Sequence, residues 1–331
     1  MNRLLLAAAL GAAAATPALA QPAPTLTVYT YSSFAGEYGP GATVAANFEA
    51  MCDCALEWVV TDDAGTLIAR LLLEGASTPA DIVLGLDTSL MEEARASGLF
   101  APHGITLEGL DLPVAWTDDT FVPFDWGWFA FVYDSETLAA APASLRELVT
   151  DPDGPTIIIE DPRTSSPGLG LLLWMKEVFG DGAADAWAQL APRIVTVTRG
   201  WSEAYGLFLE GEADMVLSYT TSPAYHLIAE GEDRYEAAIF EEGHALQVEV
   251  GAMVASTDQP QLAREFLDFM LTDGFQAAIP EGNWMYPATI VDVPAVFADL
   301  PRPAMSFLTA PADLVANREA WINEWLGALA P

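Results

Sequence analysis

The sequence predicts an α/β protein built as two hinged lobes with a cleft between them. Strand-like and helix-like segments alternate through most of the chain, which is typical of a mostly parallel sheet covered by helices. The 331 residues are enough for two domains, each with its own core. Two extended stretches, 121–133 and 245–255, bracket a second α/β unit. We therefore expect the chain to cross between the lobes twice.

The first unit follows a strand–helix rhythm in chain order. We expect a strand at 26–31, a helix at 41–50, a strand at 55–60, a helix at 67–74 and a buried strand at 81–84. Each strand is a short apolar run and each helix carries apolar residues at helical spacing. These elements predict a parallel sheet in the first lobe.

The second unit repeats this rhythm, and three further helices close the chain. Its elements are expected as helix 143–149, strand 156–159, helix 169–179, strand 194–197, helix 202–210 and strand 214–219. Helices at 259–271, 274–279 and 311–329 follow, and the last third of the chain is expected to pack back on the first lobe. The predicted division is a signal peptide at 1–20, a first lobe at 21–125 and 256–331, and a second lobe at 126–255.

The N-terminus has the pattern of a secretory signal peptide. Arg3 supplies the positive charge, residues 4–15 form the apolar core, and Ala18-Leu19-Ala20 is the small-residue cleavage pattern. Cleavage is therefore expected before Gln21, and the mature protein is expected to be exported. The apolar run is short for a membrane span and ends at a proline, so an anchor is the weaker interpretation.

The charge of the chain is strongly acidic and excludes some partners. Lys and Arg number 12 against 47 Asp and Glu, for a net charge of −35. Such a surface repels nucleic acid and anionic lipid but attracts a cationic ligand. The simplest role of this acidity is solubility in a salty habitat.

Cys52 and Cys54 are the two cysteines of the chain. In an oxidising compartment they either form a small disulfide or remain free thiols. A metal site is the weaker interpretation, because this pair supplies two ligands only.

No pattern in the sequence indicates an enzyme. Phosphate-loop, zinc-protease and nucleophile-elbow motifs are absent, and the near match at 200–204 ends in Ala. The histidines His103, His226 and His244 have no metal-ligand spacing. We therefore expect a binding protein without a cofactor.

Hydroxyl and aromatic residues gather where strands end. The segment 161–168, with Ser165 and Ser166, joins a strand to a helix. It suits either an anion site at the helix start or ordinary helix capping. Three other loops carry aromatic residues, and together they favour a stacking site for a flat ligand. These loops hold Trp201, Tyr219, Tyr225, Asn283 and Trp284. Asp87 and Asp125 either add charge complementarity or cap turns.

At these residues the sequence resembles the periplasmic thiamine-binding proteins, the substrate-binding subunits of thiamine ABC importers. The matching runs are 26–31, 80–87, 119–125, 161–168, 200–208, 217–225 and 282–287. The resemblance implies a type II periplasmic-binding-protein fold. It also implies that thiamine, thiamine monophosphate and thiamine diphosphate are bound as transported ligand. The implied partner is an ABC permease in the inner membrane, and we expect a monomer.

The resemblance also implies roles for single residues. Trp201, Tyr225 and Trp284 would contact the rings of the ligand, whereas Tyr31, Ser165 and Ser166 would face its phosphate end. The complete set of expected ligand-binding residues is Tyr31, Ser165, Ser166, Trp201, Tyr219, Tyr225, Asn283 and Trp284.

Two alternatives remain. A ferric-iron-binding protein of the same fold would use the neighbouring Tyr219, Tyr225 and His226. Iron sites favour tyrosine oxygens over stacking tryptophans, and this chain shows the opposite emphasis. A periplasmic thiamine-processing hydrolase would use Glu203 or another nucleophile, and it would form a product where a binding protein returns its ligand unchanged.

Overall fold

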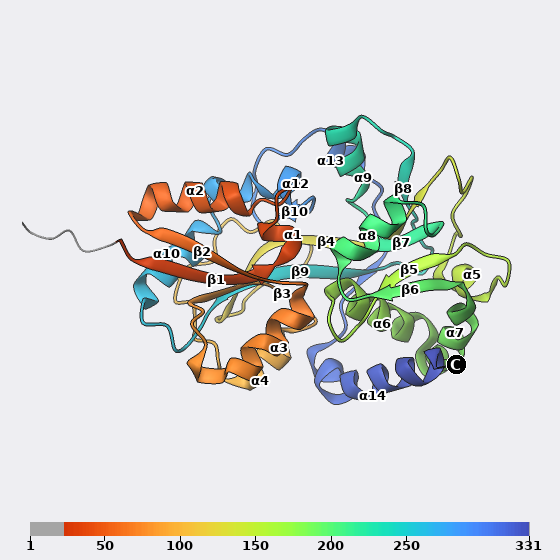
Figure 1. Cartoon of the computed structure of the whole chain (residues 1–331), viewed down its shortest axis with the longest axis horizontal. Coiled ribbons are helices and arrows are strands. Elements are labelled where there is room, and N and C mark those ends of the chain that lie inside the picture. Colours follow the sequence, from red (N-terminus) through yellow and green to blue (C-terminus); the bar gives the residue numbers. More distant parts are fainter. Residues whose placement is uncertain (1–22, 331) are drawn as a thin grey trace, which may run out of the picture.

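A computed structural model describes residues 23–330, in which eleven strands form one mixed sheet that runs through both lobes. The expected signal peptide lies outside the described residues. The main strands follow the order β2-β1-β3-β9-β4-β7-β5-β6. Parallel strands therefore lie at the two ends of this order, and two long strands lie between them (Figure 1).

The first lobe is built on three parallel strands, β1 (Thr25–Tyr31), β2 (Ala55–Thr61) and β3 (Ile82–Asp87). Its side chains alternate between the two faces of the sheet. Leu26 and Val28 join the core beneath α2, whereas Tyr29 joins the core beneath α3. The helices of this lobe are α1 (Ser32–Ala35), α2 (Gly41–Cys52), α3 (Ala64–Glu74) and α4 (Met91–Ser97).

The second lobe repeats this plan with β5 (Ile157–Glu160), β6 (Ile194–Thr198) and β7 (Met215–Tyr219), again parallel. Figure 1 shows α8 on one side of these strands and α6 and α7 on the other. The remaining strand is β8 (Tyr235–Ala237). The helices are α5 (Leu145–Thr150), α6 (Ser166–Phe179), α7 (Ala183–Leu190), α8 (Trp201–Leu209) and α9 (Pro223–Tyr225), with a π-helical turn at His226–Glu230.

Two long antiparallel strands, β4 (Phe121–Asp134) and β9 (His244–Met253), connect the lobes. Every residue of both strands is buried. The first half of β4 pairs with β9, and its second half pairs with β7 and β8 of the second lobe. These two strands lie in the extended stretches 121–133 and 245–255 that the sequence indicated. Short strands β10 (Tyr286–Pro287) and β11 (Ser306–Phe307) extend this region.

The C-terminal third divides between the lobes. Helices α10 (Pro260–Phe269) and α11 (Asp273–Gln276) pack on α2 of the first lobe, as expected. Helix α14 (Pro311–Leu329) instead packs mainly on α7 of the second lobe and also touches α4 (Figure 1). The lobe boundaries stay a prediction, but this last helix does not simply return to the first lobe. The short helices α12 (Ile279–Gly282) and α13 (Val296–Asp299) lie in the intervening loops.

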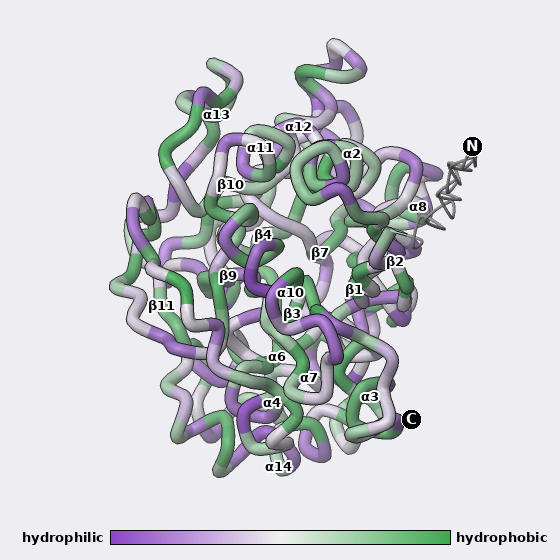
Figure 2. Tube along the Cα trace, turned by 90° about the vertical axis from the view of Figure 1, so that its left-hand side faces the viewer, coloured by the Kyte–Doolittle hydropathy of each residue, from purple (hydrophilic) through white to green (hydrophobic). Residues whose placement is uncertain are grey.

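Along the helices that surround the sheet, hydrophobic and hydrophilic positions alternate (Figure 2). In α3, for example, Leu67, Ile68 and Leu71 are buried and Leu73 is exposed. This spacing turns one face of the helix toward the core. No helix in residues 23–330 is long and apolar enough to cross a membrane.

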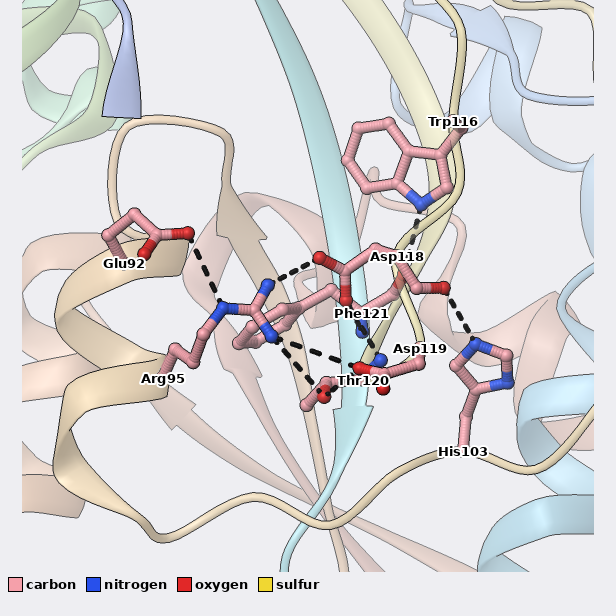
Figure 3. Close-up of polar contacts among 8 residues, drawn as sticks. All are labelled: Glu92, Arg95, His103, Trp116, Asp118, Asp119, Thr120 and Phe121. Carbon is pink, nitrogen blue, oxygen red and sulfur yellow. Dashed lines mark hydrogen bonds and ion pairs between the residues drawn. The ribbon is translucent and has the colours of Figure 1, made fainter. Parts of the chain in front are cut away.

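A polar network fastens the loop that leads into β4 (Figure 3). The Asp118 carboxylate accepts hydrogen bonds from the N–H groups of Thr120 and Phe121, both at 2.8 Å, and pairs with Arg95 of α4. His103 contacts the Asp118 carbonyl at 3.0 Å, and Trp116 donates to the Phe121 carbonyl at 3.1 Å. These contacts fix the point where β4 begins.

Cys52 and Cys54 form a disulfide at the end of α2. Asp53 between them adopts a left-handed backbone with φ 52°, which lets the two side chains meet. Of the two states left open by the sequence, the structure shows the oxidised one.

Candidate functional site

A cavity of about 470 Å³ lies between the lobes, at the ends of the parallel strands. This is where ligands bind in open α/β folds. Residues of both lobes, of β9 and of the loop after α12 line it. They include Tyr31, Tyr38, Asp63, Gly85, Ser166, Trp201, Tyr205, Tyr219, Tyr225, Glu249, Asn283 and Trp284.

One side of the cavity is an aromatic wall, formed by Trp201, Tyr205, Tyr225 and Trp284. Trp201 is the first residue of α8 and stacks on Tyr205 one turn later, with ring centroids 5.0 Å apart. The indole N–H of Trp201 donates to Ser218 Oγ at 2.7 Å, which fixes the ring plane. The first half of the wall is therefore a flat, oriented surface.

Tyr225 and Trp284 form the second half of the wall. Their rings meet edge to face with centroids 5.3 Å apart, although Tyr225 belongs to α9 and Trp284 to the loop after α12. Trp284 has a left-handed backbone with φ 56°, which is uncommon for a bulky residue. Such conformations are costly and concentrate at functional sites. The two ring pairs suit a flat, partly aromatic ligand.

A second group of residues, the acidic floor, consists of Tyr31, Glu249 and Asn283 of the lining and of the fully buried Asp125, which Asn283 contacts. Tyr31 donates its hydroxyl proton to Glu249 Oε2 at 2.6 Å. Asn283 Nδ2 donates to the Tyr31 oxygen at 2.9 Å and to Asp125 Oδ2 at 2.6 Å. Gly85 has φ 102°, and a Cβ there would lie 2.2 Å from the Tyr31 ring. Glycine at this position thus makes room for the tyrosine.

Burial dominates the electrostatics of the floor. It raises the pKa of Asp125 to about 8. Burial and the neighbouring Asp125 carboxyl raise the pKa of Glu249 well above its ordinary range. Among the described residues that line the cavity there is no Lys, Arg or His to neutralise these acids. A cation placed in the cavity favours their charged forms, so the floor is suited to a positively charged ligand.

The helix starts at the cavity already interact with carboxylates. Asp63, the N-cap of α3, accepts hydrogen bonds from the N–H groups of Ala64 at 2.7 Å, Trp201 at 3.2 Å and Ser166 at 3.4 Å. The hydroxyl of Ser166 donates to Asp87. Ser165, the N-cap of α6, makes no side-chain cap hydrogen bond, so ordinary capping by this segment is not what the structure shows. Carboxylates from elsewhere in the chain interact with the start of α6 instead, and an anion site there stays a prediction.

The structure brings the expected binding residues together. Seven of the eight line the cavity, and the eighth, Ser165, is buried directly before α6 with 2% of its surface exposed. Their contact with a ligand stays a prediction. Asp87 does cap a turn, since it accepts the Ser89 N–H at 2.6 Å, but it also reaches Ser166. Asp125 is fully buried and belongs to the floor.

The residues considered for the two alternative functions, ferric-iron binding and thiamine hydrolysis, have other partners or lie outside the cavity. Tyr219 donates to Gln247 at 3.1 Å and Tyr225 donates to Glu230 at 3.1 Å. The ring of His226 lies between Tyr205 and Glu230, 2.9 and 2.7 Å from their oxygens. The three groups proposed for iron thus point to different neighbours. Glu203 is exposed on α8 and does not line the cavity.

Three important residues of the cavity were not predicted, namely Asp63, Tyr205 and Glu249. Glu249 had a signal, since a charged residue interrupts the apolar run of an expected crossing strand. Asp63 also had one, because Asp directly before a helical pattern indicates an N-cap. Tyr205 has the spacing of an ordinary core residue, so no pattern separates it from the core.

The chain belongs to the bacterial extracellular solute-binding protein family, whose model matches residues 11–277. More particularly, it is similar to the thiamine-binding periplasmic protein of Escherichia coli strain K12. The two are 54% identical over 307 residues, which cover 93% of this chain and 94% of the relative. A relative of the same name from Brucella suis is 53% identical, with 93% of each chain covered.

Solved structures support the two-lobed, type II architecture. A periplasmic thiamin binding protein superposes with a TM-score of 0.92 at 54% identity, covering 93% of this chain and 97% of that one. Iron-bound HitA from Pseudomonas aeruginosa superposes with a TM-score of 0.74 at 21% identity, covering 91% and 99%. The second likeness shows the fold alone. The expected fold class is therefore confirmed.

Proposed function

We propose that this chain is a periplasmic solute-binding protein that captures thiamine and delivers it to an ABC import permease. Thiamine carries a cationic thiazolium ring and a flat aminopyrimidine ring. The single observation that supports the proposal most is a cavity lined both by aromatic rings and by carboxylic acids. The relatives at 53–54% identity bear the name of thiamine-binding proteins.

Thiamine monophosphate and thiamine diphosphate belong to the same proposal. The start of α6 at Ser166 offers N–H and hydroxyl donors, which suit a phosphate. The carboxylates of Asp63 and Asp87 lie nearby and would repel the negative charge of a phosphate group. We therefore expect thiamine, its monophosphate and its diphosphate to bind with different affinities. Thiamine and its phosphates are cargo in this proposal, and no cofactor is required.

The test is a calorimetric titration of the mature protein with thiamine and its two phosphates. We expect saturable binding of thiamine with a stoichiometry of one. A neutral aminopyrimidine that lacks the thiazolium ring is the control, and it should bind at least about tenfold more weakly because it leaves the acidic floor unpaired. Absence of binding by all three thiamine species would refute the proposal.

The remaining parts of the proposal have their own measurements. Recovery of unchanged thiamine after long incubation supports a carrier, whereas a degradation product would establish the hydrolase. An iron–tyrosinate absorption band on adding Fe³⁺ would establish the iron-binding protein. N-terminal sequencing from the periplasmic fraction should begin at Gln21, and sedimentation should give a monomer.

A further inference from the structure

A buried histidine lies behind the aromatic wall. His226 has none of its surface exposed and does not line the cavity. Its ring stacks with Tyr205 of the wall and with Tyr235 of β8, at centroid distances of 5.9 and 3.9 Å and interplanar angles of 18° and 28°. Since Trp201 stacks on Tyr205 in turn, a connected series of stacked rings leads from the cavity into the second lobe.

The two ring nitrogens of His226 connect two tyrosines of the wall. Nε2 lies 2.9 Å from the hydroxyl of Tyr205, and Nδ1 lies 2.7 Å from Oε2 of Glu230. The other oxygen of that carboxylate, Oε1, accepts the hydroxyl proton of Tyr225 at 3.1 Å. Tyr205 and Tyr225 therefore belong to one hydrogen-bond chain, in which His226 and Glu230 are the middle members.

The donors and acceptors of this chain have one consistent arrangement. A carboxylate only accepts hydrogen bonds, so Nδ1 of His226 carries the hydrogen that points at Glu230. Burial lowers the pKa of His226, and the hydrogen bond from His226 lowers the pKa of Glu230. A neutral ring beside a charged carboxylate is therefore the stable state at neutral pH. Nε2 of that ring accepts the hydroxyl proton of Tyr205, so both tyrosines donate to groups outside the cavity lining.

The local backbone accounts for the spacing of the chain. Helix α9 ends at Tyr225 and is followed by the π-helical turn His226–Glu230. The repeat of such a turn is i to i+5, which is the separation of Tyr225 and Glu230. Single π-helical turns are rare and frequently mark functional sites. Tyr205 comes from α8, so the chain also ties α8 to α9.

We propose that His226 is a positioning residue for ligand capture, which together with Glu230 holds the rings of Tyr205 and Tyr225 in the orientation that receives the flat rings of the ligand. The inference rests on the proposed function. A hydrogen bond at its hydroxyl restrains a tyrosine ring that would otherwise swing about its side-chain torsions. The wall is then ordered before the ligand arrives, and binding does not bear that entropic cost. Loss of the chain should weaken binding although no atom of the cavity lining is removed.

The test compares His226→Phe with the unmodified mature protein by calorimetric titration of thiamine. Phe keeps a flat ring in the stacked series but makes no hydrogen bond. We expect the affinity for thiamine to fall about fivefold, the effect of losing one ordering hydrogen bond. His226→Gln should restore the affinity to within about twofold of the unmodified protein, because its amide offers both a donor and an acceptor.

His244→Phe is the matched control. His244 is also fully buried and uses both ring nitrogens, accepting from the Phe240 N–H at 2.8 Å and donating to the Phe129 carbonyl at 2.7 Å. Its ring packs on Trp174, and it does not line the cavity. Its replacement should lower stability in urea but leave the affinity for thiamine within about twofold of the unmodified protein.

A second comparison asks whether His226 acts through the hydroxyls of the wall. Tyr205→Phe combined with Tyr225→Phe removes both hydroxyls and keeps both rings. In this background His226→Phe should change the affinity for thiamine less than about twofold, because the groups that the histidine positions are already absent. An equal loss in both backgrounds would show that the histidine supports the lobe as a whole, and it would contradict the inference.

Glu230→Ala tests the same chain from its other end if His226→Phe does not fold. The Glu230 side chain is 39% exposed and lies outside the cavity lining, so its removal spares the core. We expect the affinity for thiamine to fall about fivefold here as well. Glu232→Ala removes an exposed acid two positions away, which pairs with Arg234 at 3.9 Å, and it should leave the affinity unchanged.

Three results would overturn the inference. They are an affinity within about twofold of the unmodified protein in His226→Phe and Glu230→Ala, a loss in His244→Phe as large as in His226→Phe, and a His226→Gln variant no better than His226→Phe. Failure of the unmodified protein to bind any thiamine species is a different result, which refutes the proposed function itself. The unmodified protein, titrated first, distinguishes the two cases.

Discussion

The aromatic wall and the acidic floor belong to one cavity, but they differ in how they are built. The wall rings come from α8, α9 and a C-terminal loop, and all of them except the buried Tyr205 are half-buried. The floor acids are buried, and Asp125 and Glu249 lie on the two crossing strands. The residues expected to contact the flat rings of the ligand therefore lie on parts of the protein that can move with a lobe. The residues expected to interact with the charge of the ligand lie on the strands that join the lobes.

The largest expected effect on thiamine affinity comes from a change in the aromatic wall. Trp201→Ala should weaken thiamine binding at least tenfold, because it removes the stacking face and its cation–π attraction, roughly 0.5–2 kcal/mol, together with buried apolar area. Calorimetric titration measures the change. Trp201→Phe keeps a ring but loses the N–H bond to Ser218, so its affinity for thiamine should lie between those of Trp201→Ala and the unmodified protein. An affinity unchanged in Trp201→Ala would mean that the wall does not contact the ligand.

The next effect concerns the floor and its pH dependence. Thiamine lowers the pKa of the floor acids when it binds, so binding releases protons and affinity should rise as the pH rises from 6 to about 8, where Asp125 titrates. Glu249→Gln keeps the hydrogen bond from Tyr31 but not the charge. At pH 8 it should bind thiamine about fivefold more weakly, with a flatter pH profile.

Glu236→Gln is the control for this variant. Glu236 accepts a hydrogen bond from Tyr133 at 2.7 Å, as Glu249 does from Tyr31, but it lies outside the cavity lining. Its thiamine affinity and pH profile should match the unmodified protein. If both variants behave alike, the pH dependence arises outside the floor.

The last expected effect is on stability and does not involve the ligand. Glu160 is fully buried, neither carboxylate oxygen has a hydrogen-bond partner among the described residues, and burial raises its pKa well above the ordinary value. The folded protein therefore binds more protons than the unfolded chain between the two pKa values. Stability is complete below the unfolded pKa of about 4.3 and falls as the pH rises through the folded pKa.

Urea unfolding at pH 5 and pH 8 measures this fall, which we expect to be at least about 1 kcal/mol. Glu160→Gln resembles the protonated acid, so it should match the unmodified protein at pH 5 and exceed it at pH 8. If Glu160→Gln loses as much stability between pH 5 and pH 8 as the unmodified protein does, the loss arises from the other buried acids.

Much of the fold could be predicted from local patterns. The parallel strands of both lobes and the crossing strands are continuous apolar runs, which periodicity detects. Helix α7, Ala183–Leu190, was not predicted, although its buried residues Ala183, Ala186, Trp187 and Leu190 follow helical spacing. The expected helix at 274–279 is interrupted, since Pro280 has no N–H for the Gln276 carbonyl, and α11 ends there. The position of α14 depends on packing between distant segments.

The residues of the candidate site likewise divide into those that local sequence patterns indicate and those that depend on contacts between distant segments. Trp201, Tyr225 and Trp284 lie in segments that the sequence predicted as loops after strands or helices, where an aromatic residue is conspicuous. The pairing of Tyr31 with Glu249 joins residues 218 positions apart, and no local pattern predicts it. The contact of Asp63 with two helices of the other lobe likewise depends on how the lobes meet.

The placement of Asp125 on β4 and Glu249 on β9 has a kinetic consequence. Strands about which two lobes turn move little, whereas α8 and its Trp201 belong to the second lobe and move with it. We therefore expect the floor to keep one geometry in the open and the closed protein, so that a cation can dock there before closure begins. We expect the wall to engage second, so quenching of tryptophan fluorescence should lag behind ligand encounter and reach a concentration-independent rate.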